Sequence, residues 1–459
     1  MTIRKLLAAV MLSLVSIMAL AADSWTITKD QRDVEALAEK LLAMPQMQAQ
    51  REEVFKAWSA HPYAATQTGR RRLQMAINEI MFNGAVAGAN SDPRRPKVVW
   101  SIAPPIEWHG YRKRGNRVNI DNPDNLYIYI PIEGASSYEI TVRNRPPGPV
   151  ATTFFIWDAF LSEGSKNAVG KNGHFWDQPI DGIRSKDIQK DAGGSFKLTV
   201  DDKPVNGRPN HMQSNADARV VFIRESLSDW AKQNPYEITV KRTGGPVVGK
   251  LPTMDEMANR AVAVVKGAMA LDAWYGVKMA NDRPNILEKP WIRSTGASTD
   301  MSKRWGFNSQ GYFKLAHDEA LLVTVDLAGA DYLGALLCDP WQISIDPQFS
   351  NTSLNNAQAE HNADGTVTYV ISGDDPGVKN WLDTGGLSEG YLTFRWIGIP
   401  VTVPNAQAEA AVKSIEVVKF ADLPKLLPAS ATRVSPSERL QQYAERTRAV
   451  AHHYGLPDK

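Results

Sequence analysis

Apolar residues recur at helical spacing in two stretches near the start of the chain. The first spans residues 29–60 and is interrupted at Pro45, and the second spans residues 73–86. A spacing of three or four residues places apolar side chains on one face of a helix. The pattern therefore predicts amphipathic helices, and we expect a helical segment over residues 22–92.

Farther along, the pattern changes to short runs in which apolar and polar residues alternate. Alternation with many β-branched and aromatic residues is typical of half-buried β-strands. The runs form two groups, with strands expected from Leu126, Tyr138, Thr152, Ser195, Ala218 and Tyr236 in the first and from Ala320, Trp341, Thr366, Tyr391 and Ser414 in the second. Because no helix separates the strands within a group, each group predicts an antiparallel sandwich.

Helical patterns lie between the two groups of strands and after the second. Thr253 is the expected N-cap of a connecting helix, and Ser435 is the expected N-cap of a terminal helix that begins at Pro436. The expected fold class is mainly β, with two antiparallel β-sandwich domains, the second resembling a jelly roll, and with flanking and inserted α-helices. The expected domains are a first β domain at 93–250, a helical connector at 251–290, a second β domain at 291–425 and a C-terminal helix at 426–459.

Residues 1–21 predict a secretory signal peptide. Arg4 and Lys5 precede an apolar run, which ends at the small-residue cleavage site formed by Ala19 and Ala21. The remaining chain contains no run that approaches the roughly 20 apolar residues of a membrane-spanning helix. The expected location is therefore periplasmic or secreted, with no membrane span after cleavage.

Composition limits the classes of partner and cofactor. The chain has 52 basic and 50 acidic residues and a net charge of +2, which gives no general attraction to nucleic acid. Its single cysteine, Cys338, excludes an internal disulfide. No zinc spacing, phosphate loop, dinucleotide fingerprint or nucleophile elbow occurs. We expect a small-molecule ligand, no cofactor and no metal, and homo-oligomerisation is left open.

The densest group of polar candidates lies in DDPGVKNWLDTGG, residues 374–386. Asn380, Trp381 and Asp383 bring an amide, an aromatic ring and a carboxylate close together. In the functional interpretation they line the mouth of a sandwich and orient a ligand. In the structural interpretation the polar side chains bond the loop backbone, and the tryptophan fills the core.

A second candidate pair precedes a strand of the second group. His317 and Glu319 are two residues apart, so their side chains point to the same face of a strand. A histidine beside a carboxylate can act as a general base, although an edge histidine with solvated carboxylates has the same pattern. The candidate catalytic residues are Asp383, Glu319 and His317, and the candidate ligand-binding residues are Asn380, Trp381, Arg395, Trp396 and Asn355. For Arg224 we expect a structural ion pair with Asp229.

Several stretches resemble a bacterial family classed as domain of unknown function 1214, which is often found with its partner class 1254. The resemblance is carried by DNPDNLY from Asp121, RESLSDW from Arg224, SLN from Ser353, DPGVKNWLDT from Asp375 and the RW pair at Arg395. It implies an immunoglobulin-like sandwich followed by a jelly-roll domain interrupted by helices, and it implies no particular reaction. Family members often carry a histidine where this chain has Leu387.

The leading hypothesis is an exported soluble protein that binds, and in an extended version processes, a small organic molecule in a pocket of the second β domain. One alternative is a glycoside- or ester-processing hydrolase. A glycosidase needs two carboxylates about 5 to 9.5 Å apart, for which Glu319 and Asp383 are the candidates. The other alternative is a non-catalytic envelope or assembly protein. In such a protein, the residues of the stretches that carry the family resemblance are buried and form hydrogen bonds with one another.

Overall fold

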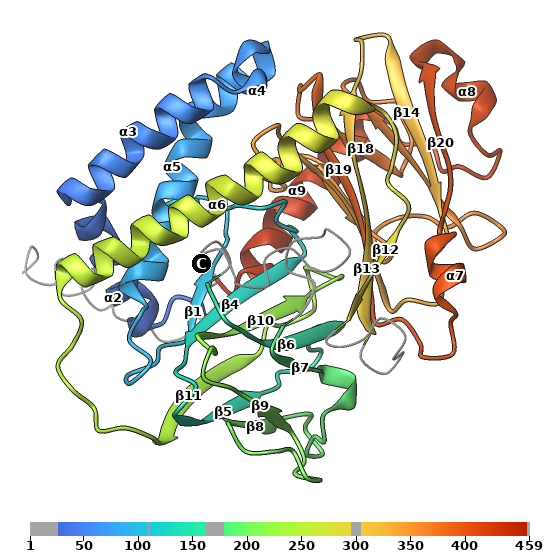
Figure 1. The fold of residues 1–459 in the computed structure, drawn as a ribbon. Helices are drawn as coiled ribbons and strands as arrows, with labels where there is room; N and C mark the ends of the chain where they lie inside the picture. The colour runs from blue at the N-terminus through green and yellow to red at the C-terminus, as the bar shows by residue number, and fades with distance from the viewer. Residues whose placement is uncertain (1–25, 109, 161–178, 295–303, 457–459) are drawn as a thin grey trace, which may run out of the picture.

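The chain is mainly β and contains two sandwiches with helices packed along them (Figure 1). The computed structural model describes residues 26–108, 110–160, 179–294 and 304–456, without the side chains of 271–282. The predicted signal peptide lies outside the described residues. Each sandwich pairs a five-stranded sheet with a four-stranded sheet.

The first sandwich is formed by residues from the first predicted group of strands. Its five-stranded sheet has the order β1 (Val99–Ser101), β4 (Asn125–Pro131), β10 (Val220–Ser226), β6 (Ala151–Trp157) and β7 (Asp181–Arg184). Its four-stranded sheet has the order β11 (Glu237–Gly244), β5 (Ser137–Arg143), β8 (Phe196–Asp201) and β9 (His211–Gln213). A separate hairpin joins β2 (Ile106–Trp108) to β3 (Tyr111–Lys113).

The second sandwich repeats this arrangement with longer central strands. Its five-stranded sheet has the order β12 (Trp291–Ser294), β13 (Arg304–Lys314), β19 (Glu389–Ile397), β15 (Tyr332–Cys338) and β16 (Ser353–Asn355). Its four-stranded sheet has the order β18 (Trp381–Asp383), β17 (Val367–Ser372), β14 (Glu319–Val325) and β20 (Val412–Lys419). Apart from the short parallel pairs β8 with β9 and β17 with β18, the paired strands of both sandwiches are antiparallel.

The described helices are α2 (Lys29–Leu42), α3 (Pro45–Ser59), α4 (Pro62–Ala65), α5 (Gln67–Ala89), α6 (Met254–Asp282), α7 (Asn405–Glu409), α8 (Leu423–Leu426) and α9 (Pro436–His453), with 3₁₀ turns at Ser185–Asp187 and Phe420–Asp422. Five of the described helices, α2, α4, α5, α6 and α9, begin at a residue whose side chain caps the helix. Thr253 and Ser435 each form a capping box, with Glu256 and Glu438 respectively, so both predicted N-caps are confirmed. Among the described residues, no helix is both long and apolar enough to cross a membrane.

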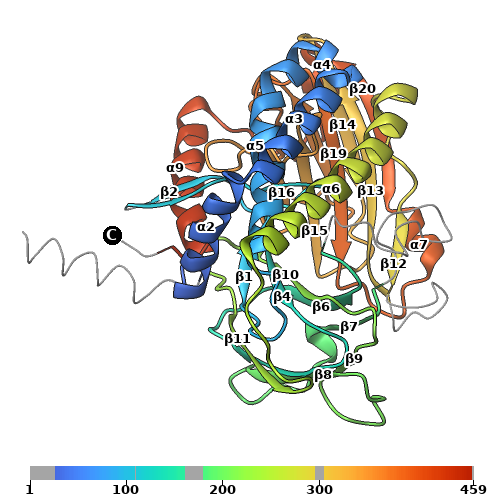
Figure 2. The same ribbon diagram turned by 60° about the vertical axis from the view of Figure 1, so that its left-hand side comes forward.

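Helices α5 and α6 pack against each other and share one apolar core with the outer faces of both five-stranded sheets (Figures 1 and 2). Gly88 permits the close approach of the two helices, because a Cβ atom there would lie 2.4 Å from the carbonyl oxygen of Met257. The shared core includes Tyr127 and Phe222 of the first sandwich and Trp305 and Tyr391 of the second. The outer faces of the two sheets are therefore joined by a common interior.

One predicted strand is wrong. The segment from Trp341 forms a turn instead, because the Asp339 carboxylate accepts hydrogen bonds from the backbone nitrogens of Trp341 at 2.9 Å and Ile343 at 3.2 Å. The Trp341 ring stacks on Trp58 of α3, with 4.9 Å between ring centroids. The alternating pattern here reflects a tethered turn against a helix rather than a strand.

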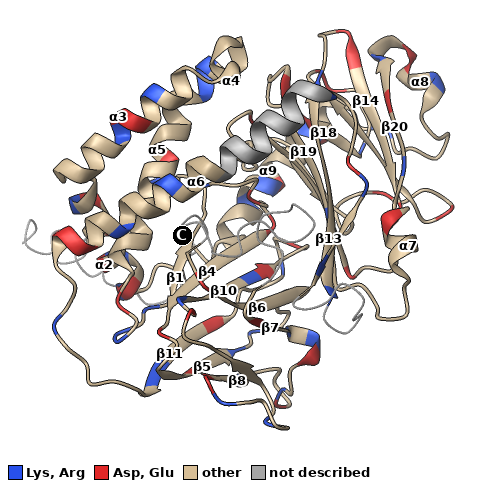
Figure 3. Ribbon diagram, viewed as in Figure 1, with Lys and Arg blue, Asp and Glu red and all other residues tan. Residues whose placement is uncertain are grey.

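Charged residues of both signs occur on the helices and on both sandwiches (Figure 3). This distribution agrees with the nearly equal numbers of basic and acidic residues in the sequence.

Candidate functional site

Arginine side chains meet between the two sandwiches. On β10, Arg224 stands directly opposite Tyr127 of β4, on the face that carries Phe222 toward the shared core. On β19, Arg395 stands opposite Asn308 of β13. Side chains alternate along a strand, so both arginines project from the outer faces of their sheets.

Arg224 lies against aromatic rings from both sandwiches. The carbon of its guanidinium is 5.6 Å from the ring centroid of Tyr127, 5.3 Å from that of Phe222 and 5.4 Å from that of Trp305. The Arg293 guanidinium of β12 lies 4.5 Å from the same Trp305 ring. These distances fall within the range of cation–π attraction, which stabilises positive charge here but supplies no hydrogen-bond acceptor.

The cluster contains buried polar atoms without hydrogen-bond partners in the described part of the chain. They include the Nε atoms of Arg224 and Arg395, the Nε1 atom of Trp305 and the hydroxyl of Tyr129. A buried donor left without an acceptor costs about 1 to 3 kcal/mol. Because such atoms are rare in native interiors, a local group of them requires an explanation, such as a bound ligand or water.

The electrostatics of the cluster favour a bound anion. Desolvation by the surrounding rings, together with the positive charges of Arg293 and Arg395, lowers the pKa of Arg224 to about 9. Among the described residues, no Asp or Glu forms an ion pair with Arg224 or Arg395. Arg395 does donate from Nη2 to the carbonyl oxygen of Ile120, which fixes its orientation. A guanidinium group offers donors in a planar fork that matches a carboxylate.

Solvent reaches part of this arrangement. Arg395 is 7% exposed, whereas Arg224 is partly exposed although its Nε atom is covered. The rings of Tyr127, Phe222 and Trp305 are 3%, 1% and 4% exposed, so they are covered by protein and hold the Arg224 guanidinium in place. The arrangement can therefore pair the anionic group of a small molecule with guanidinium donors. Among the described residues, no cluster of three or more His, Cys, Asp or Glu could hold a metal ion.

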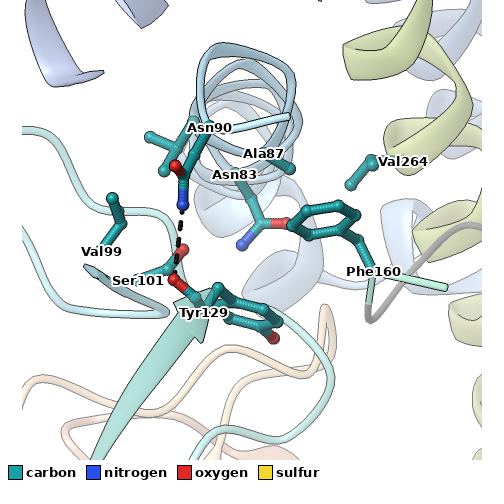
Figure 4. A pocket seen from close by; sticks show the side chains of 9 residues that line it. Asn83, Ala87, Asn90, Val99, Ser101, Tyr129, Phe160 and Val264 are labelled. Atoms are coloured by element: carbon teal, nitrogen blue, oxygen red, sulfur yellow. Dashed lines mark hydrogen bonds between the residues drawn. The ribbon is translucent and has the colours of Figure 1, made fainter. Parts of the chain in front are cut away.

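A separate cavity lies beside Tyr129, between α5, α6 and the first sandwich (Figure 4). Its volume is about 20 Å³, and its lining includes Asn83, Asn90, Phe160 and Val264. Asn90 donates to the carbonyl oxygen of Tyr129 at 3.4 Å, the dashed contact in Figure 4. A cavity of this size has room for about one water molecule, so it is too small for an organic ligand.

The two tryptophans predicted to contact a ligand are covered by protein. Trp396 is 0% exposed, stacks on Phe307 with 4.5 Å between centroids, and lies inside the second sandwich. Trp381 is 4% exposed on the opposite face of the four-stranded sheet, where Arg439 of α9 lies 5.1 Å from its ring centroid. The two rings do not share a pocket.

The predicted polar ligand-binding residues have protein partners. The Asn380 amide accepts from the Glu360 nitrogen at 2.7 Å and donates to the Glu360 oxygen at 2.7 Å. Asn355 is buried and donates to Asp124 at 3.1 Å. Of these residues, Arg395 is the one that the structure places in the arginine cluster.

The three predicted catalytic residues do not converge. The His317 side chain is 89% exposed and lies 3.4 Å from Asp374, while Glu319 pairs with Lys419 at 3.3 Å. Strand β17 separates the strands of Glu319 and Asp383. Their side chains point to opposite faces of the sheet, because Asp383 shares the face of Trp381 and Glu319 shares the face of Leu321.

The Asp383 carboxylate is partly buried and has a hydrogen-bond donor in its own loop. It accepts from the Gly385 nitrogen at 2.8 Å, and desolvation raises its pKa. The neighbouring Asp375 binds Arg439 of α9 through contacts of 2.9 and 3.1 Å. Leu387 packs in the core of the second sandwich. The loop from Asp375 therefore serves as the docking point of the C-terminal helix.

Three of the other stretches that carry the family resemblance meet at a buried carboxylate between the two sandwiches. Asp124 is 0% exposed and accepts from Trp230 Nε1 at 2.7 Å, from the Tyr332 hydroxyl at 2.7 Å and from Asn355 at 3.1 Å. Its donors come from RESLSDW, from β15 and from the SLN stretch. Desolvation raises the pKa of Asp124, although the hydrogen bonds oppose this rise. These residues form a satisfied structural junction.

Sequence reasoning missed the role of Arg224. The expected pair with Asp229 is wrong, because Asp229 pairs with Lys232 at 3.1 Å while Arg224 lies on the rings of the shared core. A signal was present in the sequence. Arg224 interrupts an alternation that begins with Val220 and Phe222 on the outer face of β10.

Comparisons with known proteins support the fold. No protein-family model matches the chain, and no curated protein matches it. The chain is similar to an uncharacterised protein of known structure from Burkholderia cenocepacia, with 21% identity, a TM-score of 0.65, and coverage of 84% of this chain and 100% of that one. A protein from Vibrio parahaemolyticus has 11% identity, covers 65% of this chain and 90% of its own, and has a TM-score of 0.39, too low to carry an argument. The first likeness shows the fold alone.

Proposed function

We propose that the protein binds a small organic anion between its two β-sandwiches. In this proposal Arg224 and Arg395 pair with the anionic group, and the buried rings of Tyr127, Phe222 and Trp305 hold the Arg224 guanidinium in position. The observation that carries the proposal is the presence of two guanidinium Nε donors, both buried and without partners in the described part of the chain.

A carboxylate or similar group would relieve two unfavourable features of this cluster. It would supply acceptors for the donors, and its charge would offset the repulsion between Arg224 and the neighbouring Arg293 and Arg395. Hydrogen bonds to charged groups contribute about 1.5 to 3 kcal/mol each. The binding site in this proposal lies between the two β domains rather than within the second.

The proposal extends to the protein's class and location. The basic, apolar and small-residue pattern of residues 1–21 supports export to the periplasm or beyond. The stretches from Asp121, Arg224 and Asp375 support a relationship to domain of unknown function 1214. A ligand-binding role in the envelope is compatible with both inferences.

The proposal can be tested by thermal shift and calorimetry with paired probes. Benzoate and hexanoate should bind saturably, whereas benzyl alcohol and hexanol, which lack the charge, should bind at least tenfold more weakly. Arg224→Gln and Arg395→Gln should each weaken anion binding at least tenfold. Arg219→Gln is the matched control, since Arg219 is exposed just before β10.

Two results would count against the proposal. One is equal affinity for the charged and neutral probes, and the other is unchanged affinity in both cluster variants. Native mass spectrometry of protein purified from cells that produce it provides an independent measurement. A co-purifying anion that is absent from Arg224→Gln protein would identify the ligand class.

A non-catalytic assembly role is the second candidate. The observation that favours it is the junction at Asp124, where residues of three sequence stretches satisfy one another away from solvent. If no probe binds, and if cells that carry the Arg224→Gln variant grow like cells that carry the unaltered protein, this role would be preferred. The hydrolase alternative receives less support, because Glu319 and Asp383 project from opposite faces of their sheet.

A further inference from the structure

A slot of about 370 Å³ opens along one side of the first sandwich. It lies where β11, the edge strand of the four-stranded sheet, approaches β1 and β4 of the other sheet, beside the start of α2 (Figure 2). Its volume is within the range of about 300 to 1,000 Å³ that is usual for small-molecule sites. The cavity beside Tyr129 is far smaller, at about 20 Å³.

The slot is lined by residues of both sheets and of α2, and its lining combines apolar side chains with polar ones such as Gln31 and Thr239. Val98, Trp100 and Ile128 line one side, and Ile238 and Val240 line the other. Val98, Ile238 and Val240 pack against the sandwich core but remain partly exposed. Partly exposed apolar side chains on two facing walls are what an apolar ligand would cover.

The slot is long and narrow. Its lining follows β11 from Pro235 to Val240, a span of about 17 Å at about 3.4 Å per residue. The two sheets of a sandwich lie about 10 Å apart between backbones, so the side chains of both sheets narrow the space that remains in the slot. A linear chain fits this shape better than a fused ring system.

The mouth of the slot is polar and balanced in charge. Thr28, Lys29 and Asp30 lie there at the beginning of α2. Lys29 pairs with Asp33 at 2.5 Å, and Asp30 lies 3.9 Å from Lys97. A small polar head group, neutral or singly charged, can be accommodated at this end while the chain stays in the apolar part.

We propose that this slot binds a single alkyl or acyl chain with a small polar head, which enters between the open edges of the first sandwich. The site is separate from the arginine cluster, because Ile128 and Tyr127 point to opposite faces of β4. The proposal therefore does not depend on the anion site. A fatty acid and a long-chain alcohol share this chemistry and differ in head-group charge.

The test is displacement of the linear fluorescent polyene fatty acid cis-parinarate from the full-length protein. Octanoate, decanoate, dodecanoate and dodecanol should compete at one saturable site, with affinity rising about fourfold for each added methylene. Equal potency of dodecanoate and dodecanol would mean that the chain alone is recognised. Tighter binding of dodecanoate would add a role for Lys29 at the mouth.

Two variants place a carboxylate in the slot wall. Ile238→Asp and Val240→Asp should each weaken probe binding at least tenfold, whereas Val205→Asp, at a site 40% exposed outside the slot, should leave it unchanged. Thermal melting identifies any variant that fails to fold, and the milder Ile238→Ser replaces it, with a loss of several-fold expected. The proposal is overturned if the probe does not saturate, if affinity is independent of chain length, or if folded slot variants bind as tightly as the unaltered protein.

Discussion

Arg224 lies over the indole ring of Trp305, 5.4 Å from its centroid, although the two residues belong to different sandwiches. The contact joins a cation on β10 to an aromatic side chain on β13. Both residues carry a buried nitrogen that has no hydrogen-bond partner in the described part of the chain. The interface between the domains is therefore closely packed, yet two of its buried nitrogen donors have no hydrogen-bond acceptor in the described part of the chain.

The stability of the unliganded protein should increase when this charge is removed. For Arg224→Met we expect a gain of about 1 kcal/mol in the free energy of unfolding, because an uncompensated guanidinium is replaced by an apolar side chain of similar length. The measurement is urea denaturation of ligand-free protein. A loss of stability greater than about 1 kcal/mol would show that Arg224 has a structural partner that the proposed function overlooks.

Arg117→Met is the matched comparison for that experiment. Arg117 is 2% exposed, but unlike Arg224 it forms an ion pair among the described residues, with Glu79, and donates from Nη1 to the Ser344 oxygen at 2.8 Å. Removing one partner of a buried pair leaves an uncompensated charge and costs about 3 to 5 kcal/mol. The two arginine variants should therefore change stability in opposite directions.

Anion binding at the arginine cluster should weaken in alkaline solution. Burial and neighbouring positive charge lower the pKa of Arg224 to about 9 in the unliganded protein. An anion prefers the protonated guanidinium, so affinity should be constant below about pH 8 and fall as the pH rises through about 9. Calorimetric titration of benzoate across this range checks the prediction, and an affinity that stays constant to pH 10 would contradict it.

The sequence was most informative where structure depends on neighbours along the chain. The caps at Thr253 and Ser435 were predicted because capping is local chemistry. Strands β13 and β15 were not predicted, since Arg304–Lys314 contains polar residues on a face that becomes buried, and Tyr332–Cys338 is an unbroken apolar run. The buried polar face of β13 and the unbroken apolar run of β15 both depend on packing against other parts of the fold, which the local sequence does not reveal.

The candidate site was less accessible for the same reason. Arg395 was selected from the sequence, but its relation to Arg224 depends on how the outer faces of two sheets pack. Trp396 and Arg395 are adjacent in sequence, yet alternation along β19 sends Trp396 into the sandwich and Arg395 out of it. The sequence analysis placed Arg395 and Trp396 in one site because they are adjacent, whereas in the strand their side chains lie on opposite faces of the sheet.

The junction at Asp124 should be essential for stability. Asp124→Ala would leave the indole of Trp230, the hydroxyl of Tyr332 and the amide of Asn355 without this buried acceptor. We expect a loss of about 3 kcal/mol or more in the free energy of unfolding. Chemical denaturation provides the measurement, with Asp217→Ala at an exposed position as control; equal stability of the two variants would refute the structural role.

Glu225 predicts a distinctive dependence of stability on pH. This carboxyl group is 0% exposed inside the first sandwich, where one oxygen accepts from the Tyr236 nitrogen at 3.2 Å and the other has no partner in the described part of the chain. Burial raises its pKa from 4.5 to about 8. The folded protein thus retains a proton that the unfolded chain releases above about pH 4.5.

The stability contributed by this proton is complete below about pH 4.5 and should be lost as the pH rises to about 8, by an amount on the order of 4 kcal/mol. Glu225→Gln keeps the shape of the protonated acid and cannot ionise. The variant should therefore lack this part of the pH dependence and be more stable than the unaltered protein at pH 8, as measured by urea denaturation at several pH values. If both proteins lose stability in parallel between pH 5 and pH 8, Glu225 is already ionised in the folded state. The carboxylate must then have a hydrogen-bond donor or a positive charge beside it in the first sandwich.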